Sequence, residues 1–184
     1  MSSFLFGFAL VLLVSLGARD QLLVARLARR TGPGLLLAGA VAATVSAFLM
    51  AAAGRLIAVD LFPEAGKMLI AIALLVAAIE LVWPMHHKVP REPTHSIFAA
   101  FVVLLARQIG DAGRFLVFAL SAWTALPWLT AAGAALGGIA SLAVGWSMGP
   151  ALEASLPLRW IRLAMALALL LAALVIGLGV RGMI

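Results

Sequence analysis

The sequence predicts an all-α integral membrane protein with six transmembrane helices, arranged as two inverted three-helix repeats. The first observation is composition: 65% of the 184 residues are hydrophobic, 11% are charged, and the mean hydropathy is +1.19. Soluble domains are about 45–50% apolar and about 25% charged, so a soluble globule is excluded. The second observation is a division into six apolar runs, and the third is a spacing shared by the two halves of the chain.

The six apolar runs are the predicted spans, because about 20 apolar residues in a helix cross the hydrocarbon core. Their approximate limits are 4–27, 35–59, 68–83, 97–123, 128–146 and 160–180. Helix-breaking residues separate the runs, as at Pro33, Pro63, Pro84, Pro127 and Pro157. The lipid bilayer is therefore the first partner that the sequence predicts.

Three landmarks recur in the same order in both halves of the chain. They are Gly17 with Gly110 at a shift of 93, then Pro33 with Pro127 and Pro63 with Pro157 at a shift of 94. An odd number of spans in each repeat inverts the second copy relative to the first. We therefore expect a first repeat at 1–83, a linker at 84–95 and a second repeat at 96–184.

Basic residues are concentrated after the first span, in the linker and before the sixth span. They are Arg26, Arg29, Arg30, Lys88, Arg91, Arg159 and Arg162. The positive-inside rule then places both termini outside the cytoplasm. This bias also explains the net charge of +6, and no extended basic surface remains for nucleic acid. Short loops and the lack of a targeting segment favour a bacterial inner membrane.

Two polar segments lie inside predicted spans, at 15–21 and 108–114. A charge at the bilayer centre costs about 2.5–3.5 kcal/mol or more, so such residues usually face the bundle interior. Arg107, Asp111 and Arg114 are spaced i, i+4, i+7, which predicts one shared helical face. On that face Asp111 can pair with either arginine. Arg19 and Asp20 are consecutive and must point in different directions, so Asp20 is a candidate partner of Arg114.

Two interpretations of these polar segments remain open. In the first they form an ion- or substrate-binding site at the repeat interface, with arginines pairing the carboxylates. The binding candidates are Asp111, Gln108, Ser15, Asp20 and Gln21, of which Asp111 and Gln108 are the candidate metal ligands, and the charge-pairing candidates are Arg19, Arg107 and Arg114. In the second interpretation the same groups form a buried ion-pair lock that fixes the register of the two halves.

Other chemistry is not indicated by the sequence. There are no cysteines, so disulfides and thiolate sites are excluded. No nucleophile–base arrangement or metalloprotease motif is present, so we expect neither an enzyme nor a bound cofactor. Gly133 and Gly137 form a GxxxG pattern, which is typical of close helix packing, either within one bundle or in a homodimer.

The two polar segments resemble the repeated motif of the GDT1 family of membrane transporters, Glu-x-Gly-Asp-(Lys/Arg)-(Thr/Ser), often followed by Gln. The first segment shares the glycine, the basic residue and the trailing glutamine at Gly17, Arg19 and Gln21. The second shares the glycine and the aspartate at Gly110 and Asp111. The resemblance implies two three-span repeats and transport of Mn²⁺ or Ca²⁺ in exchange for protons.

The chain departs from this motif at most acidic positions. Ser15 and Gln108 stand at the glutamate positions, and Ala18 stands at the first aspartate position. Asp111 alone keeps its place, while Asp20 occupies a hydroxyl position. Two hypotheses follow from this. The chain is a divergent cation transporter with an altered ion site. Alternatively, it is a non-transporting pseudo-transporter, a structural or accessory subunit that pairs as a heterodimer with an intact homologue or with another membrane partner.

Overall fold

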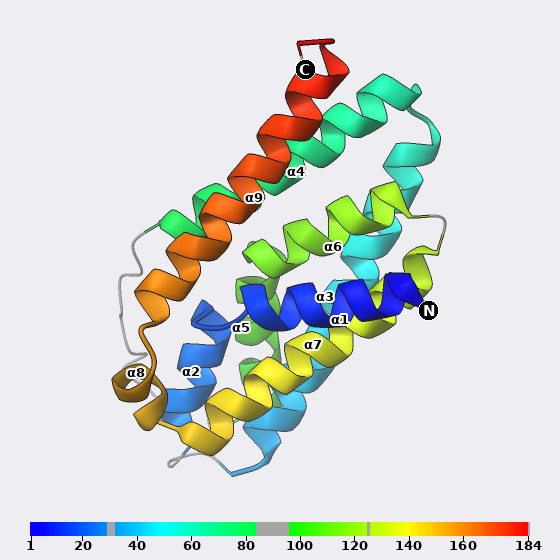
Figure 1. Cartoon of the computed structure of the whole chain (residues 1–184). Coiled ribbons are helices and arrows are strands. Elements are labelled where there is room, and N and C mark those ends of the chain that lie inside the picture. Colours follow the sequence, from blue (N-terminus) through cyan, green and yellow to red (C-terminus); the bar gives the residue numbers. More distant parts are fainter. Residues whose placement is uncertain (29–31, 84–95, 125, 184) are drawn as a thin grey trace.

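The protein is described here by a computed structural model covering residues 1–28, 32–83, 96–124 and 126–183 (Figure 1). Every regular element in these ranges is a helix. The helices are α1 (Ser2–Val14), α2 (Arg19–Leu27), α3 (Gly34–Val59), α4 (Pro63–Val82), α5 (Ile97–Ile109), α6 (Ala112–Trp123), α7 (Pro127–Met148), α8 (Ala151–Ser155) and α9 (Leu158–Val180). The predicted linker at 84–95 lies outside the described residues.

The helices agree with an all-α membrane protein but give four to five candidate spans. The helices α3, α4, α7 and α9 are each long and apolar enough to cross a bilayer, and the pair α1 and α2 makes a fifth span bent by 65°. The helices α5 and α6 have only 13 and 12 residues. The expectation that 4–27 and 97–123 are single helices is therefore wrong, since each contains two. Helix α8 was not expected from the sequence.

The first break lies at Gly17, between α1 and α2. Its φ of +76° falls in the left-handed region, which costs an L side chain about 1–2 kcal/mol. A Cβ at this position would also lie 3.2 Å from the Cβ of Leu158. Glycine therefore lets the chain turn here while α9 packs against the turn.

The second break lies at Gly110 and Asp111, between α5 and α6. Asp111 is the N-cap of α6, and its carboxylate accepts a hydrogen bond from the Gly113 amide at 3.3 Å. Aspartate is a favoured N-cap because its oxygen satisfies an amide that has no partner within the helix. The predicted shared helical face of Arg107, Asp111 and Arg114 is consequently wrong: the helix ends between the first residue and the other two.

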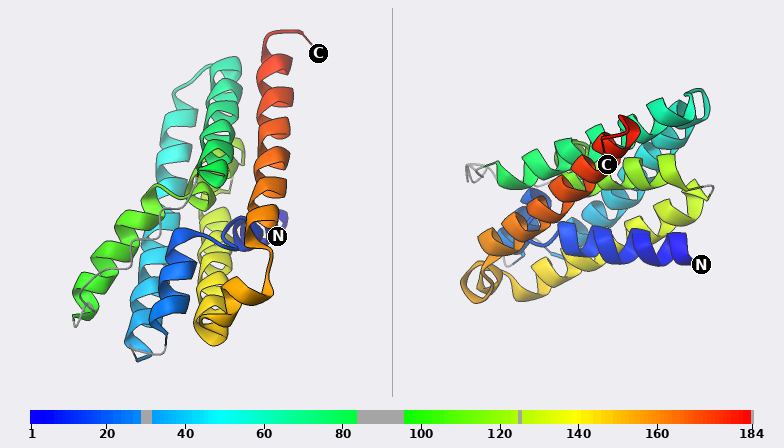
Figure 2. Two further views of the ribbon diagram at one scale, coloured as in Figure 1. Left: turned by 90° about the vertical axis from the view of Figure 1, so that its left-hand side faces the viewer. Right: turned by 45° about the horizontal axis from the view of Figure 1, so that its top comes forward.

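The long helices α3 and α7 pack together at the centre, and each also packs against one broken helix. Helix α7 contacts α1 and α2, while α3 contacts α5 and α6 (Figures 1 and 2). Helix α4 lies along α9 and also contacts α6. The helix α5 extends away from the rest of the bundle (Figure 2).

Glycines make the close contacts of α7 possible. A Cβ at Gly133 would collide with the carbonyl of Phe4, and one at Gly137 would collide with the carbonyl of Phe8. The GxxxG pattern therefore faces α1 inside the chain. This arrangement favours intramolecular packing as the role of these two glycines.

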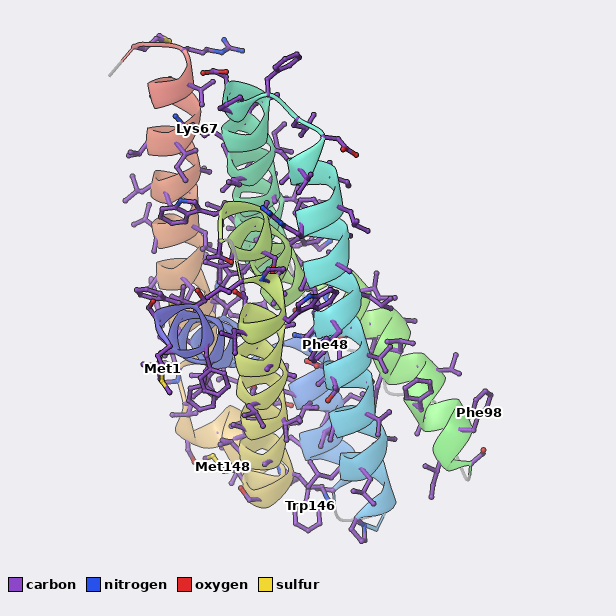
Figure 3. The ribbon with its side chains drawn as sticks, turned by 90° about the vertical axis from the view of Figure 1, so that its right-hand side faces the viewer. Met1, Phe48, Lys67, Phe98, Trp146 and Met148 are labelled. Atoms are coloured by element: carbon purple, nitrogen blue, oxygen red, sulfur yellow. The ribbon has the colours of Figure 1, made fainter. Side chains whose placement is uncertain are left out.

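The outer faces of the bundle are apolar, as a lipid environment requires. Many large hydrophobic side chains are exposed, including Phe98, Leu37, Leu56 and Leu167. Lys67 lies towards one end of the long helices, and Trp146 and Met148 lie towards the other (Figure 3). Charged side chains that are buried between these ends are therefore exceptions in an otherwise apolar bundle.

Candidate functional site

The two helix breaks meet inside the bundle. The Gln108 side chain, in the last turn of α5, donates its Nε2 to Asp20 Oδ2 at 3.0 Å. Asp20 Oδ1 accepts a second hydrogen bond, from the Gln21 amide at 2.8 Å. Gln108 and Asp20 are 1% and 7% exposed. An amide and a carboxylate, 88 positions apart in the sequence, therefore satisfy each other away from solvent.

Ser15 and Asp111 lie beside this contact. A Cβ built on Gly113 would be 3.1 Å from Ser15 Oγ and 3.2 Å from Asp111 Oδ2, so both oxygens border the first turn of α6. Both residues are buried. The Asp111 amide also donates to the Gln108 carbonyl at 3.0 Å. Ser15, Asp20, Gln108 and Asp111 are thus brought together, and we call these four residues the polar junction.

Gln21 binds a different part of the bundle. Its Oε1 accepts from the Gly17 amide at 2.6 Å, and its Nε2 donates to the Ser141 carbonyl of α7 at 2.8 Å. The Ser141 hydroxyl in turn donates to the Ser15 carbonyl at 3.0 Å. Gln21 therefore holds the first break against α7, and both of its amide atoms are hydrogen-bonded to backbone groups.

Arg114 fastens the second break to α3. Its Nε donates to Ser46 Oγ at 2.6 Å, and its Nη2 donates to the Ala43 carbonyl at 3.3 Å. The Gln108 Oε1 atom accepts from Ser46 Oγ at 3.1 Å and from Arg114 Nη2 at 3.5 Å. Ser46 lies near the middle of α3, so a guanidinium group is held at mid-helix depth. A continuous hydrogen-bonded path runs from Asp20 through Gln108 to Arg114.

The three arginines proposed for charge pairing behave differently from one another. Arg19 forms an ion pair with Glu80 Oε1 at 3.3 Å. Arg114 and Arg107 have no carboxylate within 4.0 Å among the described residues, so the expected pairs with Asp111 and with Asp20 are not formed. The expectation that Arg19, Asp20 and Gln21 point in different directions is confirmed: they contact α4, α5 and α7 respectively.

A second buried charge cluster adjoins the first break. Arg162 Nη1 donates to the Gly17 carbonyl at 3.2 Å, and Arg162 Nη2 donates to the Glu80 carbonyl at 3.1 Å. Arg162 Nη2 also lies 3.6 Å from Glu80 Oε2, and both side chains are almost fully buried. Glu80 is therefore shared by Arg19 and Arg162. Gly17 connects this cluster with Gln21.

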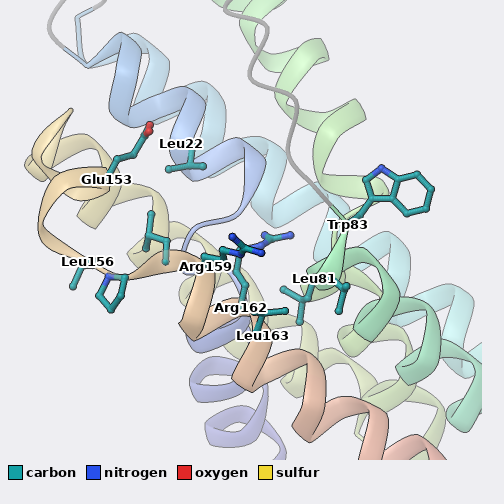
Figure 4. Close-up of a pocket in the computed structure, with 11 residues that line it drawn as sticks. Leu22, Leu81, Trp83, Glu153, Leu156, Arg159, Arg162 and Leu163 are labelled. Carbon is teal, nitrogen blue, oxygen red and sulfur yellow. The ribbon is translucent and has the colours of Figure 1, made fainter.

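A cavity of about 710 Å³ opens beside this second cluster (Figure 4). Arg159 and Arg162 line it, together with Leu81, Trp83 and the loop before α9. Glu153 lies at its rim and is bound by Arg26 through Nε at 2.6 Å. Arg162, which forms part of the cavity wall, is thus hydrogen-bonded directly to the turn at Gly17.

The described residues contain no group of three or more His, Cys, Asp and Glu side chains placed to hold a metal ion. The junction offers the carboxylates of Asp20 and Asp111 and the hydroxyl of Ser15, which are oxygen donors suited to a hard cation. The Gln108 amide oxygen, a predicted metal ligand, is already engaged by Ser46 and Arg114. The arrangement can therefore bind a proton or a cation, but with few free ligands.

Residues 96–183 match the sequence model of a family described as divalent cation/proton antiporter GDT1. The second half of the chain is therefore similar to the GDT1 family. No curated protein and no solved structure matches the chain. The GDT1 match begins just before α5 and includes Gln108, Asp111 and Arg114. The match supports the GDT1 resemblance and includes the second of the two polar segments, and the family is one of transporters rather than enzymes.

Several residues around the GDT1 motifs were missed by sequence reasoning. Arg162 was assigned to the loop before the sixth span, yet it is a buried partner of Glu80. Ser46 and Ser141 hold the two breaks against α3 and α7, and they are 95 positions apart. Their separation of 95 positions is close to the shifts of 93 and 94 that relate the other landmarks of the two halves. That similarity was the sequence signal that could have identified these two serines.

Proposed function

We propose that this chain is a proton-coupled cation transporter whose binding site is the polar junction of Ser15, Asp20, Gln108 and Asp111. The observation that carries the proposal is the burial of two carboxylates where two helix breaks meet. Broken helices place polar groups and exposed backbone at the midplane of many secondary transporters. Intramembrane carboxylates commonly mark ion pathways and proton relays.

The coupling follows from competition for the same oxygens. A carboxylate that binds a proton loses the negative charge that attracts a cation, so proton and cation binding exclude each other. Release of one to one side and uptake of the other from the opposite side then gives antiport. Mn²⁺ and Ca²⁺ are the first cations to test, because divalent cations are the substrates that the family description names.

We further propose that the two halves form an inverted repeat, with units at 1–83 and 96–184 joined by 84–95. The helix contacts support this: α7 packs against α1 and α2 as α3 packs against α5 and α6. Rocking of one such unit against the other is the usual route to alternating access. The distribution of loop arginines supports termini outside the cytoplasm, and the short loops fit the proposed bacterial inner membrane.

A second candidate function is that of a non-transporting subunit, in a homodimer or beside an intact homologue. The observation that favours it is Arg114, whose guanidinium group is bound to oxygens at the edge of the junction. Such a fixed network would act as a lock between the halves. In that case the chain would purify with its partner and carry no cation.

The proposed function is tested by uptake into liposomes containing the purified chain. We expect an outward proton flux coupled to entry of an external cation when a panel of Mn²⁺, Ca²⁺ and monovalent cations is tried. Asp111→Asn should abolish the flux and keep the fold, because asparagine is also a good N-cap. Asp60→Asn, at the exposed C-cap of α3, is the matched control and should transport normally. Absence of flux with every cation would favour the second candidate.

A further inference from the structure

Arg114 is a buried cation without a buried anion in contact with it. Its side chain is 2% exposed, and its hydrogen-bond acceptors are a hydroxyl, a backbone carbonyl and an amide oxygen. Within the described part of the chain no carboxylate lies within 4.0 Å, and Nη1 has no hydrogen-bond partner. A buried charge is costly unless it is paired, so the positive charge of this group acts on its surroundings.

The closest structural link from Arg114 to a carboxylate runs through Gln108. Gln108 accepts from Arg114 and donates to Asp20, and its backbone carbonyl accepts from the amide of Asp111. The junction therefore contains two ionisable carboxylates, and one permanent cation, Arg114, borders it. Two negative charges and one positive charge leave a formal charge of −1, which a single proton or a single monovalent cation neutralises.

The neighbouring charge cluster does not offset Arg114. Glu80 is shared by Arg19 and Arg162, so that cluster has two positive charges and one negative charge. It is joined to the first break through the Gly17 carbonyl. Its formal charge of +1 adds to the repulsion that a divalent cation would meet in the junction.

The other half of the chain shows that this position does not require a charge. Gln21 lies 93 positions before Arg114, the same shift that relates Gly17 to Gly110. Gln21 reaches Ser141 on α7 as Arg114 reaches Ser46 on α3. A neutral amide thus fastens the first break, and a guanidinium group performs the equivalent task at the second.

We propose that Arg114 is a specificity-determining residue that restricts the junction to singly charged cargo, a monovalent cation or a proton, and rejects divalent cations. This inference rests on the proposed function, since it names the substrate class of the same site. Arg114 supplies one positive charge permanently and engages the Gln108 oxygen that a divalent ion would need as a ligand. The permanent charge is secure because arginine does not deprotonate in proteins.

The test is equilibrium binding of MnCl₂ and CaCl₂ to the purified full-length chain by titration calorimetry. We expect no saturable binding by the wild type. Arg114→Gln, which copies the residue of the first half, should show saturable Mn²⁺ binding, with an association constant at least about tenfold above the detection limit that the wild type does not reach. Adding Asp111→Asn to R114Q should remove the gained binding. Arg107→Gln removes the same charge from a half-buried site on α5 outside the hydrogen-bonded path, and it should leave binding unchanged.

Mn²⁺ binding by the wild type as tight as by R114Q would overturn the proposal, as would an equal gain in R107Q. Arg114→Met, which fills similar space without charge, provides the same comparison if R114Q does not fold. The proposed function can fail separately. If the wild type transports nothing but R114Q gains Mn²⁺ binding, the transport proposal fails and the role of Arg114 stands. If the wild type takes up Mn²⁺, the transport proposal stands and the proposed role of Arg114 fails.

Discussion

Gln108 and Asp20 join the two broken helices of the bundle through a hydrogen bond of 3.0 Å between Nε2 and Oδ2. The two residues lie in different halves of the chain, and each is buried. Gln108 also accepts from Ser46 on α3. One amide side chain therefore links both breaks and a central helix.

Replacement of Gln108 by an apolar residue of similar size should destabilise the bundle, because the hydrogen bonds of its amide are lost. Gln108→Leu keeps a similar volume but leaves Asp20 Oδ2 without its donor. An unsatisfied buried polar group costs about 1–3 kcal/mol, and more when it is charged. We expect a fall in the thermal unfolding midpoint in detergent. Thr44→Val is the control, because Thr44 is exposed and bonds only within its own helix at Ala40. Equal midpoints for the two variants would show that the amide contributes nothing.

The Glu80 carboxylate should matter for stability because its partner Arg162 is buried. Removing one partner of a buried pair costs about 3–5 kcal/mol. We expect the loss of stability in Glu80→Gln to lie near the lower end of this range, because Arg162 keeps its hydrogen bonds to the Gly17 and Glu80 carbonyls. Glu64→Gln, at the exposed start of the same helix, should change stability by less than about 0.5 kcal/mol. Unfolding curves of both variants make the comparison, and similar losses would contradict the assignment.

The turn at Gly17 should tolerate no side chain. Alanine at a φ of +76° costs about 1–2 kcal/mol, and its Cβ would press on Leu158 at 3.2 Å. Gly66→Ala provides a control of opposite sign. No atom lies within 4 Å of a Cβ at Gly66, and alanine in a helix is favoured by up to about 1 kcal/mol. We expect G17A to lower the unfolding midpoint and G66A to keep or raise it.

Close packing of α7 on α1 should be equally sensitive. Gly137→Val would push a side chain into the Phe8 carbonyl, which is backbone and cannot move aside. We expect a loss of about 3 kcal/mol or more and poor recovery of folded protein. Gly179→Val introduces the same group near the end of α9, where no atom lies within 4 Å. Size-exclusion profiles should be normal for G179V and aggregated for G137V; normal profiles for both would argue against this interface.

The sequence was sufficient to locate the apolar helices and the polar segments. The runs that became α3, α4, α7 and α9 were found from hydropathy alone, with ends within a few residues. A hydropathy average spans about 20 residues and is insensitive to a break of three or four. The turns at Gly17 and Gly110 were consequently predicted as continuous helix, although glycine followed by an N-capping aspartate at Asp111 was a local sign of a break.

The partners of the buried charges could not be predicted from spacing. Arg114 was expected to pair with Asp111, three positions away in a continuous helix. In the structure Asp111 precedes the helix as its cap, and Arg114 reaches Ser46, 68 positions away. Glu80 and Arg162 are 82 positions apart. Such contacts depend on how α3, α4 and α9 pack around the breaks, which no local pattern specifies.

The proposed function requires the two helix breaks to lie side by side, and a cysteine cross-link measures this directly. The chain has no native cysteine. Ser15 Oγ lies 3.1 Å from the Cβ position of Gly113, a separation compatible with a disulfide. We predict that Ser15→Cys with Gly113→Cys forms an intramolecular disulfide under mild oxidation, detected by intact mass and by a gel shift reversed on reduction. Ser15→Cys with Gly110→Cys, where Gly110 has open space around it, should stay reduced. Failure of the first pair to cross-link in folded protein, or equal cross-linking of both pairs, would contradict the junction.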